Sequence, residues 1–157
     1  MHFKDESGIT NYQSITVTVT NLTATGLKSY SNGAVYAKTT GHSIVITGSI
    51  FTSNYGQAGP ADISLEDIPA FTLSSTTITG FSVSSTAYTQ SITIGLSTSS
   101  TTTPIFSSLT LQCNDDSDYD ATTYKAIVDS GSSALTYSAP IKLTSSSLTT
   151  TSCTFKN

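Results

Sequence analysis

The sequence predicts an all-β protein, an antiparallel β-sandwich or jelly roll of about 9–11 short strands. Three observations predict it. Apolar residues alternate with hydroxyl residues at a period of two, turn residues separate these segments, and no segment keeps a helical period over the length of a helix. We find no fixed repeat along the chain and therefore do not expect a solenoid or a propeller.

The clearest strands lie in the first third of the chain. Residues 14–20 alternate strictly between apolar and hydroxyl side chains, as a half-buried strand does. Asn32-Gly33 is a strong turn signal, because both residues tolerate a positive φ. Strands at residues 34–38 and 43–51, joined by a turn at Thr40-Gly41-His42, are predicted to pair as a hairpin. Later strands are expected at residues 63–65, 71–73, 76–83, 88–96, 105–113, 124–128, 134–137, 141–143 and 152–155.

The composition excludes several classes of protein. Of 157 residues, 28 are Ser and 30 are Thr, whereas the chain has six Lys, ten acidic residues, no Arg and no Trp. A net charge of −4 without Arg is not the electrostatic footprint of a nucleic-acid-binding protein. No apolar run reaches the roughly 18 residues that a membrane-spanning helix needs. Neither nucleic acid nor a membrane is therefore expected as a partner.

We expect one domain over residues 1–157, with residues 1–12 as an N-terminal arm. The arm is polar and shows no apolar core of a secretory signal. Cys113 and Cys153 are the only cysteines, and two alternatives stand for them. They can form a disulfide that closes a loop of about 40 residues, or they remain two buried thiols.

The residues suited to catalysis are few, and we do not expect an enzyme. His42, the only His beyond the N-terminal arm, is predicted to face solvent in a turn. Asp62, Glu66 and Asp67 could supply a pair of carboxylates, as glycosidases use, but nothing in their spacing indicates that chemistry.

An acidic segment offers a candidate cation site. Asp116, Asp118 and Asp120 stand two residues apart, as oxygen ligands for calcium often do. Ala121 occupies the place where an EF-hand has its turn glycine, and Ile127 the place of its bidentate Glu. A solvated acidic loop is the favoured interpretation, and no cofactor other than this calcium is expected.

Two further patterns concern surface recognition. Tyr55 and Tyr119 are predicted to lie in loops, where a tyrosine can stack on a host-surface sugar and donate a hydrogen bond. Thr16, Thr18 and Thr20 share one face of a strand. A flat threonine array can order water at an ice surface, but only when it repeats over parallel strands. Because we find one regular copy, we interpret these threonines as an ordinary solvent face.

One stretch resembles a known family. Residues 32–50 (NGAVYAKTTGHSIVITGSI), followed by Ile68-Pro69, are similar to a recurring hairpin of bacteriophage tail-fibre and baseplate receptor-binding domains. The longer Pro-containing segment typical of that family is missing. The resemblance implies a β-sandwich knob, usually a homotrimer, that binds saccharide or protein on a host surface.

The function expected from this resemblance is that of a non-enzymatic structural protein of a virion. A fibre knob, a receptor-binding domain or a capsid-decoration domain would make shallow contacts with a host surface or with other virion subunits. The alternative is a cell-surface adhesin or filament subunit that assembles by β-strand donation, with residues 15–19 as the donor strand. The expected location is the virion or, for the alternative, the extracellular surface.

Overall fold

The structure is a computed structural model that describes residues 2–4, 15–83, 91–97, 100–113, 128–129, 141–144 and 149–156. Throughout these residues the ordered elements are strands, and each of the three sheets pairs its strands in parallel. The expectation of an all-β protein agrees with this, but the antiparallel sandwich or jelly roll is wrong. None of the described residues forms a helix long and apolar enough to cross a membrane.

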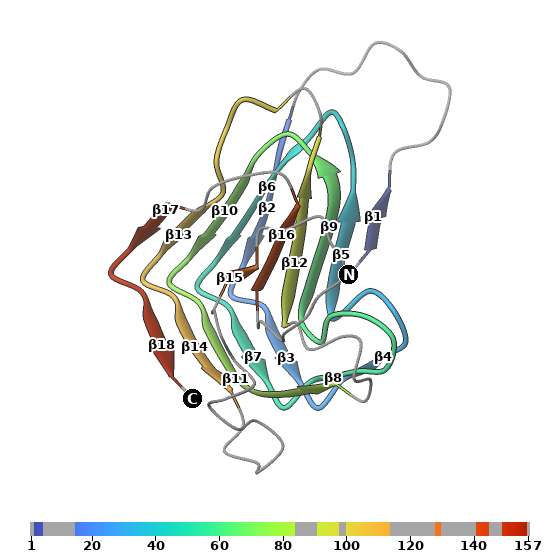
Figure 1. The fold of residues 1–157 in the computed structure, drawn as a ribbon, viewed down its shortest axis with the longest axis vertical. Coiled ribbons are helices and arrows are strands. Elements are labelled where there is room, and N and C mark those ends of the chain that lie inside the picture. Colours follow the sequence, from blue (N-terminus) through green and yellow to red (C-terminus); the bar gives the residue numbers. More distant parts are fainter. Residues whose placement is uncertain are drawn as a thin grey trace.

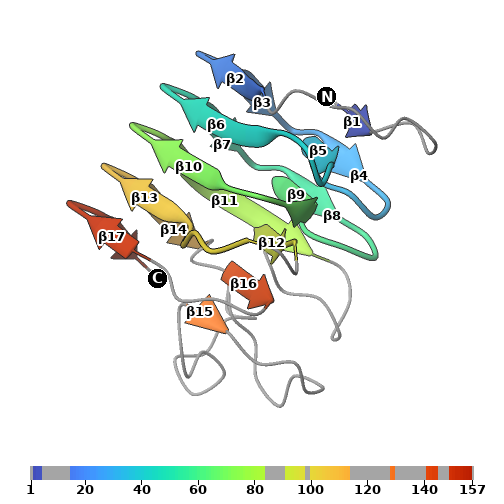
Figure 2. The same cartoon turned by 90° about the horizontal axis from the view of Figure 1, so that it is seen from above.

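The strands form successive coils that are stacked on one another (Figures 1 and 2). Each full coil visits three sheets in turn, which we call B, C and A. Sheet B has the order β17-β13-β10-β6-β2, sheet C the order β18-β14-β11-β7-β3, and sheet A the order β1-β5-β9-β12-β16-β15. The short strands β4 and β8 extend sheet C toward sheet A. The fold is therefore a parallel β-solenoid with its core enclosed by the three sheets.

The strand bounds follow the coils in chain order. They are β1 (His2–Lys4); β2 (Thr16–Thr20), β3 (Thr23–Thr25), β4 (Lys28–Ser29) and β5 (Val35–Lys38); β6 (Ser43–Thr47), β7 (Ile50–Thr52), β8 (Tyr55–Gly56) and β9 (Ile63–Ile68); β10 (Phe71–Ser74), β11 (Thr77–Val83) and β12 (Ile92–Leu96); β13 (Ile105–Ser107), β14 (Thr110–Cys113), β15 (Val128–Asp129) and β16 (Ile141–Thr144); β17 (Thr149–Thr151) and β18 (Thr154–Lys156).

The register of the strands reveals a repeat that the sequence reading missed. In sheet B, Thr18 pairs with Val45 and Val45 with Thr72, so successive coils are 27 residues long. The next steps, to Ile105 and Thr149, are longer because the connections in those coils are longer. The expectation that the chain has no solenoid repeat is wrong. The repeat conserves side-chain class and backbone conformation at each position more than residue identity, and the later insertions break its period.

The predicted hairpin of residues 34–38 and 43–51 does not form. β5 pairs with β1 and β9 in sheet A, whereas β6 pairs with β2 and β10 in sheet B. Alternation with period two arises wherever one face of a strand is buried, and it does not distinguish antiparallel from parallel neighbours. Parallel neighbours need a long connection, and here the rest of each coil supplies it.

One residue in the left-handed conformation turns the chain from sheet B into sheet C in each coil. These corner residues occupy equivalent places in five stacked coils, with φ between +46° and +61°. They are Asn21, Gly48, Ser75, Ser108 and Ser152. A single residue with positive φ re-aims the strand without a loop, and this keeps the two sheets contiguous along one edge of the solenoid.

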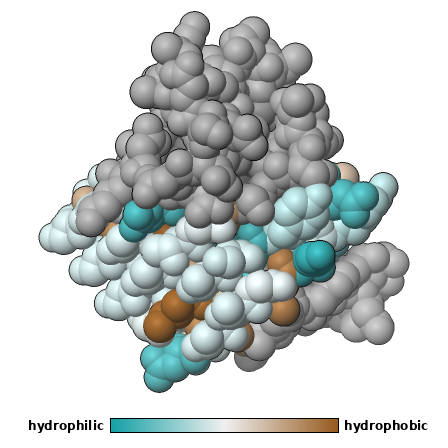
Figure 3. Space-filling model, turned by 90° about the horizontal axis from the view of Figure 1, so that it is seen from below, coloured by the Kyte–Doolittle hydropathy of each residue, from teal (hydrophilic) through white to brown (hydrophobic). Residues whose placement is uncertain are grey.

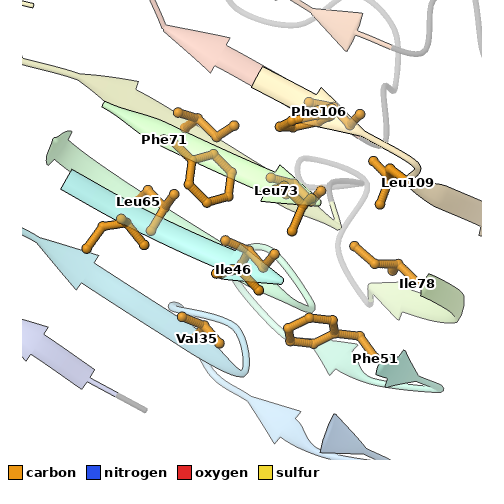
Figure 4. Close-up of a cluster of buried hydrophobic side chains, with 14 of the residues drawn as sticks. Val35, Ile46, Phe51, Leu65, Phe71, Leu73, Ile78, Phe106 and Leu109 are labelled. Atoms are coloured by element: carbon orange, nitrogen blue, oxygen red, sulfur yellow. The ribbon is translucent and has the colours of Figure 1, made fainter. Parts of the chain in front are cut away.

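The core is a single cluster of buried apolar side chains stacked in rows from coil to coil. In sheet B the inward row runs through Val19, Ile46, Leu73 and Phe106, all at most 5% exposed. The rings of Phe71 and Phe106 pack edge to face with centroids 6.0 Å apart. Figure 4 shows these side chains converging between the sheets. The outward residues of the same strands are left to face solvent.

Candidate binding surface

The outward side of sheet B carries two rows of mainly hydroxyl side chains. Because alternate residues of a strand face opposite sides, and parallel strands are in register, equivalent outward residues stack into a line. We call this surface the sheet B face. Its rows are Thr18, Val45, Thr72, Ile105 and Thr149, and Thr20, Thr47, Ser74, Ser107 and Thr151.

The outward side of sheet C continues this surface around the corner. We call it the threonine face, because seven of its nine described side chains are Thr. Its rows are Thr23, Ile50, Thr77, Thr110 and Thr154, and Thr25, Thr52, Thr79 and Gln112. Lys156 pairs in register with Gln112 at the end of the second row, and its side chain lies outside the described set.

Strand geometry sets the spacing of these side chains. Neighbouring strands are about 4.8 Å apart, and alternate residues along a strand are about 6.6 Å apart. No described side chain of either face carries a charge. Seen from below, the coloured surface is mostly of intermediate hydropathy, with a brown apolar patch among pale residues (Figure 3). The two faces are thus uncharged arrays with a regular two-dimensional repeat.

Hydrogen bonds hold hydroxyl side chains in place at the corner between the sheets. On the sheet B face, Ser74 Oγ donates to Thr47 Oγ1 of the neighbouring strand at 2.9 Å. Just inside the corner, the buried Ser49 hydroxyl donates to the Thr47 carbonyl at 3.1 Å and accepts from the Leu22 N–H at 3.2 Å. In the next coil, Thr76 Oγ1 donates to the Ser74 carbonyl at 2.9 Å. Backbone groups that turn the corner are satisfied in this way.

The threonines singled out in the sequence lie at one end of this array. Thr16, Thr18 and Thr20 are exposed on β2, as expected. The interpretation as a single regular copy is wrong, because the rows repeat over all five parallel strands of sheet B. Thr25, Thr52 and Thr79, spaced 27 residues apart, were the sequence signal that could have revealed the repeat.

A separate polar cluster lies buried in the connection from sheet C to sheet A. Asp62 is 0% exposed; its carboxylate accepts from Asn54 Nδ2 at 2.8 Å and from Ser91 Oγ at 2.7 Å. Burial raises the pKa of Asp62 to about 6, and the two hydrogen bonds oppose that shift. Asn54 also donates to the Ala24 carbonyl and accepts from the Leu27 N–H. The cluster joins neighbouring coils and is closed to a substrate.

The other two carboxylates of the weighed glycosidase set have a different role. Glu66 and Asp67 are partly exposed and contact the Lys38 ammonium at 3.0 and 3.5 Å. The hydrogen bond and charge of Glu66 raise the pKa of Lys38. Burial, and then the charge of Glu66, raise the pKa of Tyr36. Asp62 and Glu66 therefore have different partners and do not share a site.

The remaining predicted residues are placed individually. His42 lies half-buried in the turn between β5 and β6, where its N–H donates to Thr39 Oγ1 at 3.2 Å. Tyr55 is a half-buried strand residue of β8, beside Lys28 and Ser82 in register. The calcium candidates Asp116, Asp118 and Asp120, and Tyr119, lie outside the described residues. Within the described ones, no three His, Cys, Asp or Glu side chains gather as metal ligands.

The register of the last two strands of sheet C bears on the cysteines. Thr110 pairs with Thr154, so Cys153 lies beside Leu109, four residues along the chain from Cys113. Four strand residues span about 13 Å, whereas a disulfide needs Cα atoms less than about 7 Å apart. Cys153 Sγ lies 3.5 Å from the carbonyl oxygens of Phe106 and Thr151. The geometry favours the alternative of two separate thiols.

Comparison with known proteins finds no matching family model, no matching curated protein and no matching solved structure.

Proposed function

We propose that this chain is a non-enzymatic structural module that uses the sheet B face and the threonine face as a contact surface. The setting that we propose is a virion, as a fibre, receptor-binding or capsid-decoration domain. The observation that carries the proposal is the pair of adjoining faces, in which uncharged hydroxyl residues repeat over five parallel strands. Such a surface suits many shallow and equivalent contacts better than one deep site.

The use of the titratable groups supports a non-enzymatic role. Asp62 is held by Asn54 and Ser91 in the interior, and its hydrogen bonds link three coils. Lys38 bridges Glu66 and Asp67 on the opposite side of that connection. An acid–base pair must reach a substrate, and a carboxylate enclosed by the coils does not meet this requirement.

Adsorption measurements test the proposal. The purified chain is incubated with bacterial cells and with insoluble peptidoglycan, cellulose and chitin, beside the variants Thr79→Lys and Thr72→Lys, one for each face. We expect adsorption to at least one of these solids, reduced about tenfold by a Lys on the face that makes the contact. Adsorption to none of them, adsorption that both variants leave unchanged, or release of soluble sugar by the wild-type chain would overturn the proposal.

A specific observation favours the second candidate, a filament subunit. Among the described strands, nothing pairs with the outer edge of β2 or β3. The same first coil exposes Ile15, Leu27 and Tyr30, which are 52%, 46% and 71% accessible. Unpaired edges beside apolar side chains are templates for adding another strand. In this form β2 accepts a strand from another chain and does not itself leave the fold.

Light scattering after size-exclusion chromatography separates the two candidates. A fibre knob runs as a discrete trimer at every concentration, whereas a filament subunit grows with concentration. Ile15→Lys combined with Leu27→Lys should abolish that growth, and Ile105→Lys, equally exposed but on the sheet B face, should not. A species of fixed size over a hundredfold range of concentration dismisses the filament candidate.

A further inference from the structure

We propose that the threonine face binds ice, so that crystalline water is the surface recognised by this module. The inference rests on the proposed function, because it uses one of the same two faces as the contact surface. It commits to one occupant for that face, and the argument depends on the repeat of the side chains, their chemistry and their rigidity.

The repeat of the threonine face is two-dimensional and is fixed by the backbone. Successive strands give one spacing of about 4.8 Å, and alternate residues along each strand give a second of about 6.6 Å. Both spacings lie near repeats of oxygen atoms on the surface planes of ice. The 27-residue coils place Thr25, Thr52 and Thr79 in one line with strict register. A ligand that is itself periodic can therefore meet equivalent groups at every step.

The chemistry of the face suits water better than it suits a polysaccharide. A threonine offers both a hydroxyl group, which joins the hydrogen-bond network, and a methyl group, around which water is ordered. Ile50, 47% exposed in the same face, adds only methyl and methylene groups. No described side chain of the face is aromatic or charged. Sugar polymers are usually held by aromatic stacking, and charged groups would hold water in arrangements that do not match a crystal.

The side chains of the threonine face are also preorganised. Threonine is β-branched and has restricted χ1 freedom on a strand. Thr52, Thr77 and Thr79 are each half-buried between neighbouring rows. The backbone beneath them is anchored at the corner, where the Thr77 N–H donates to the Ser49 carbonyl at 3.0 Å and the Ile50 N–H to the Leu22 carbonyl at 2.8 Å. A surface that is already ordered loses little entropy when it binds a rigid lattice.

The threonine face is favoured over the sheet B face for two reasons. Its side chains are more uniform, since the sheet B face mixes Thr with Ser, Val45 and Ile105. Two hydroxyls of the sheet B face, those of Ser74 and Thr47, hydrogen-bond to one another at 2.9 Å, which draws these groups away from a ligand. The two faces therefore supply a matched pair of test sites in one coil.

Ice partition tests the inference. The full chain is mixed with a non-binding protein of similar size, a hemisphere of ice is grown slowly from the solution, and the fraction of each protein inside the ice is measured. We expect the wild-type chain to enter the ice and the reference protein to be excluded. Thr79→Lys on β11 should lower that fraction at least tenfold, whereas Thr72→Lys on β10 of the same coil should leave it unchanged.

Two smaller substitutions test the chemistry. Thr79→Val keeps the shape and both branches of the side chain, and Thr79→Ser keeps only the hydroxyl. We expect each to reduce the fraction in ice by less than Thr79→Lys does. Circular dichroism and thermal unfolding of each variant confirm that the fold persists, so that a loss of ice affinity is not a loss of structure.

Three results would overturn the inference: exclusion of the wild-type chain from ice, equal loss in Thr79→Lys and Thr72→Lys, or no loss in Thr79→Lys. If the wild-type chain is excluded from ice but adsorbs through a face to cells or polysaccharides, this inference falls and the proposed function stands. If both assays are negative, both fall.

Discussion

The corner between sheets B and C and the connection from sheet C to sheet A join neighbouring strands by different means. The first uses one left-handed residue in each of five coils and repeats. The second contains a buried carboxylate held by Asn54 and Ser91, packed beside close-fitting glycines, and occurs once. A repeated backbone device can continue through any number of coils, whereas a side-chain network fixes the order of particular coils. We expect substitutions to be tolerated at the corner and damaging at the connection.

The largest difference is expected between two glycines. A Cβ on Gly59, in the connection, would meet the backbone carbonyl of Ser31, which cannot move without shifting a neighbouring coil. Gly59→Ala should therefore lower the free energy of unfolding by about 3 kcal/mol or more. Gly26 has a φ of +63° and nothing within 4 Å of an added Cβ. Gly26→Ala should cost about 1–2 kcal/mol, from backbone strain alone.

Urea unfolding of the two variants beside the wild-type chain measures this difference. Equal losses in Gly59→Ala and Gly26→Ala would contradict the close packing of the connection. A smaller loss in Gly59→Ala would show that the Ser31 segment gives way easily.

The next effect concerns the buried carboxylate and pH. The pKa of Asp62 rises from 3.8 to about 6 on folding, so the folded state binds a proton more tightly than the unfolded state. The stabilisation is complete below pH 3.8 and is lost as the pH rises to about 6. From this group alone we expect a loss of about 2–3 kcal/mol between these values.

Asp62→Asn isolates that contribution. The amide keeps an oxygen for Asn54 Nδ2 and has no charge to bury. Urea unfolding at pH 4 and pH 7 should show that the wild-type chain loses more stability than the variant over this range, by about 2–3 kcal/mol. Other acidic groups titrate in both chains and cancel in the difference. Parallel pH profiles for the two chains would show that the Asp62 carboxylate is not desolvated.

The two regions also differ in how far the sequence predicts them. Strand positions such as residues 14–20 and 43–51, and the outward direction of Thr16, Thr18 and Thr20, follow from local alternation. The pairing of those strands does not, because parallel and antiparallel neighbours bury the same face. The corner was readable in principle, since Asn21, Gly48 and Ser75 recur every 27 residues among side chains that tolerate positive φ.

The connection could not be predicted in the same way. Nothing local distinguishes Asp62 from Glu66, yet the solenoid buries one and exposes the other. Burial of Asp62 depends on where Asn54 and Ser91 lie after the coils have stacked, and the separation between Asp62 and Ser91 in sequence is 29 residues. The threonine face is intermediate. Its members are visible in the sequence, but their convergence on one surface requires the 27-residue register.

The smallest effect is expected at the repeated corner. Ser75 is exposed and has a φ of +46°, and its N–H donates to the Ser107 carbonyl at 2.9 Å. Ser75→Gly should remove the steric cost of that φ but adds freedom to the unfolded chain, so we expect a gain of at most about 1 kcal/mol. Ser75→Val should lose about 1–2 kcal/mol, because a β-branched residue tolerates this conformation least. Thermal unfolding of both variants measures the pair. A stable Ser75→Val chain would mean that the corner does not depend on the left-handed residue, and the distinction between the two regions would then rest on the Asp62 cluster alone.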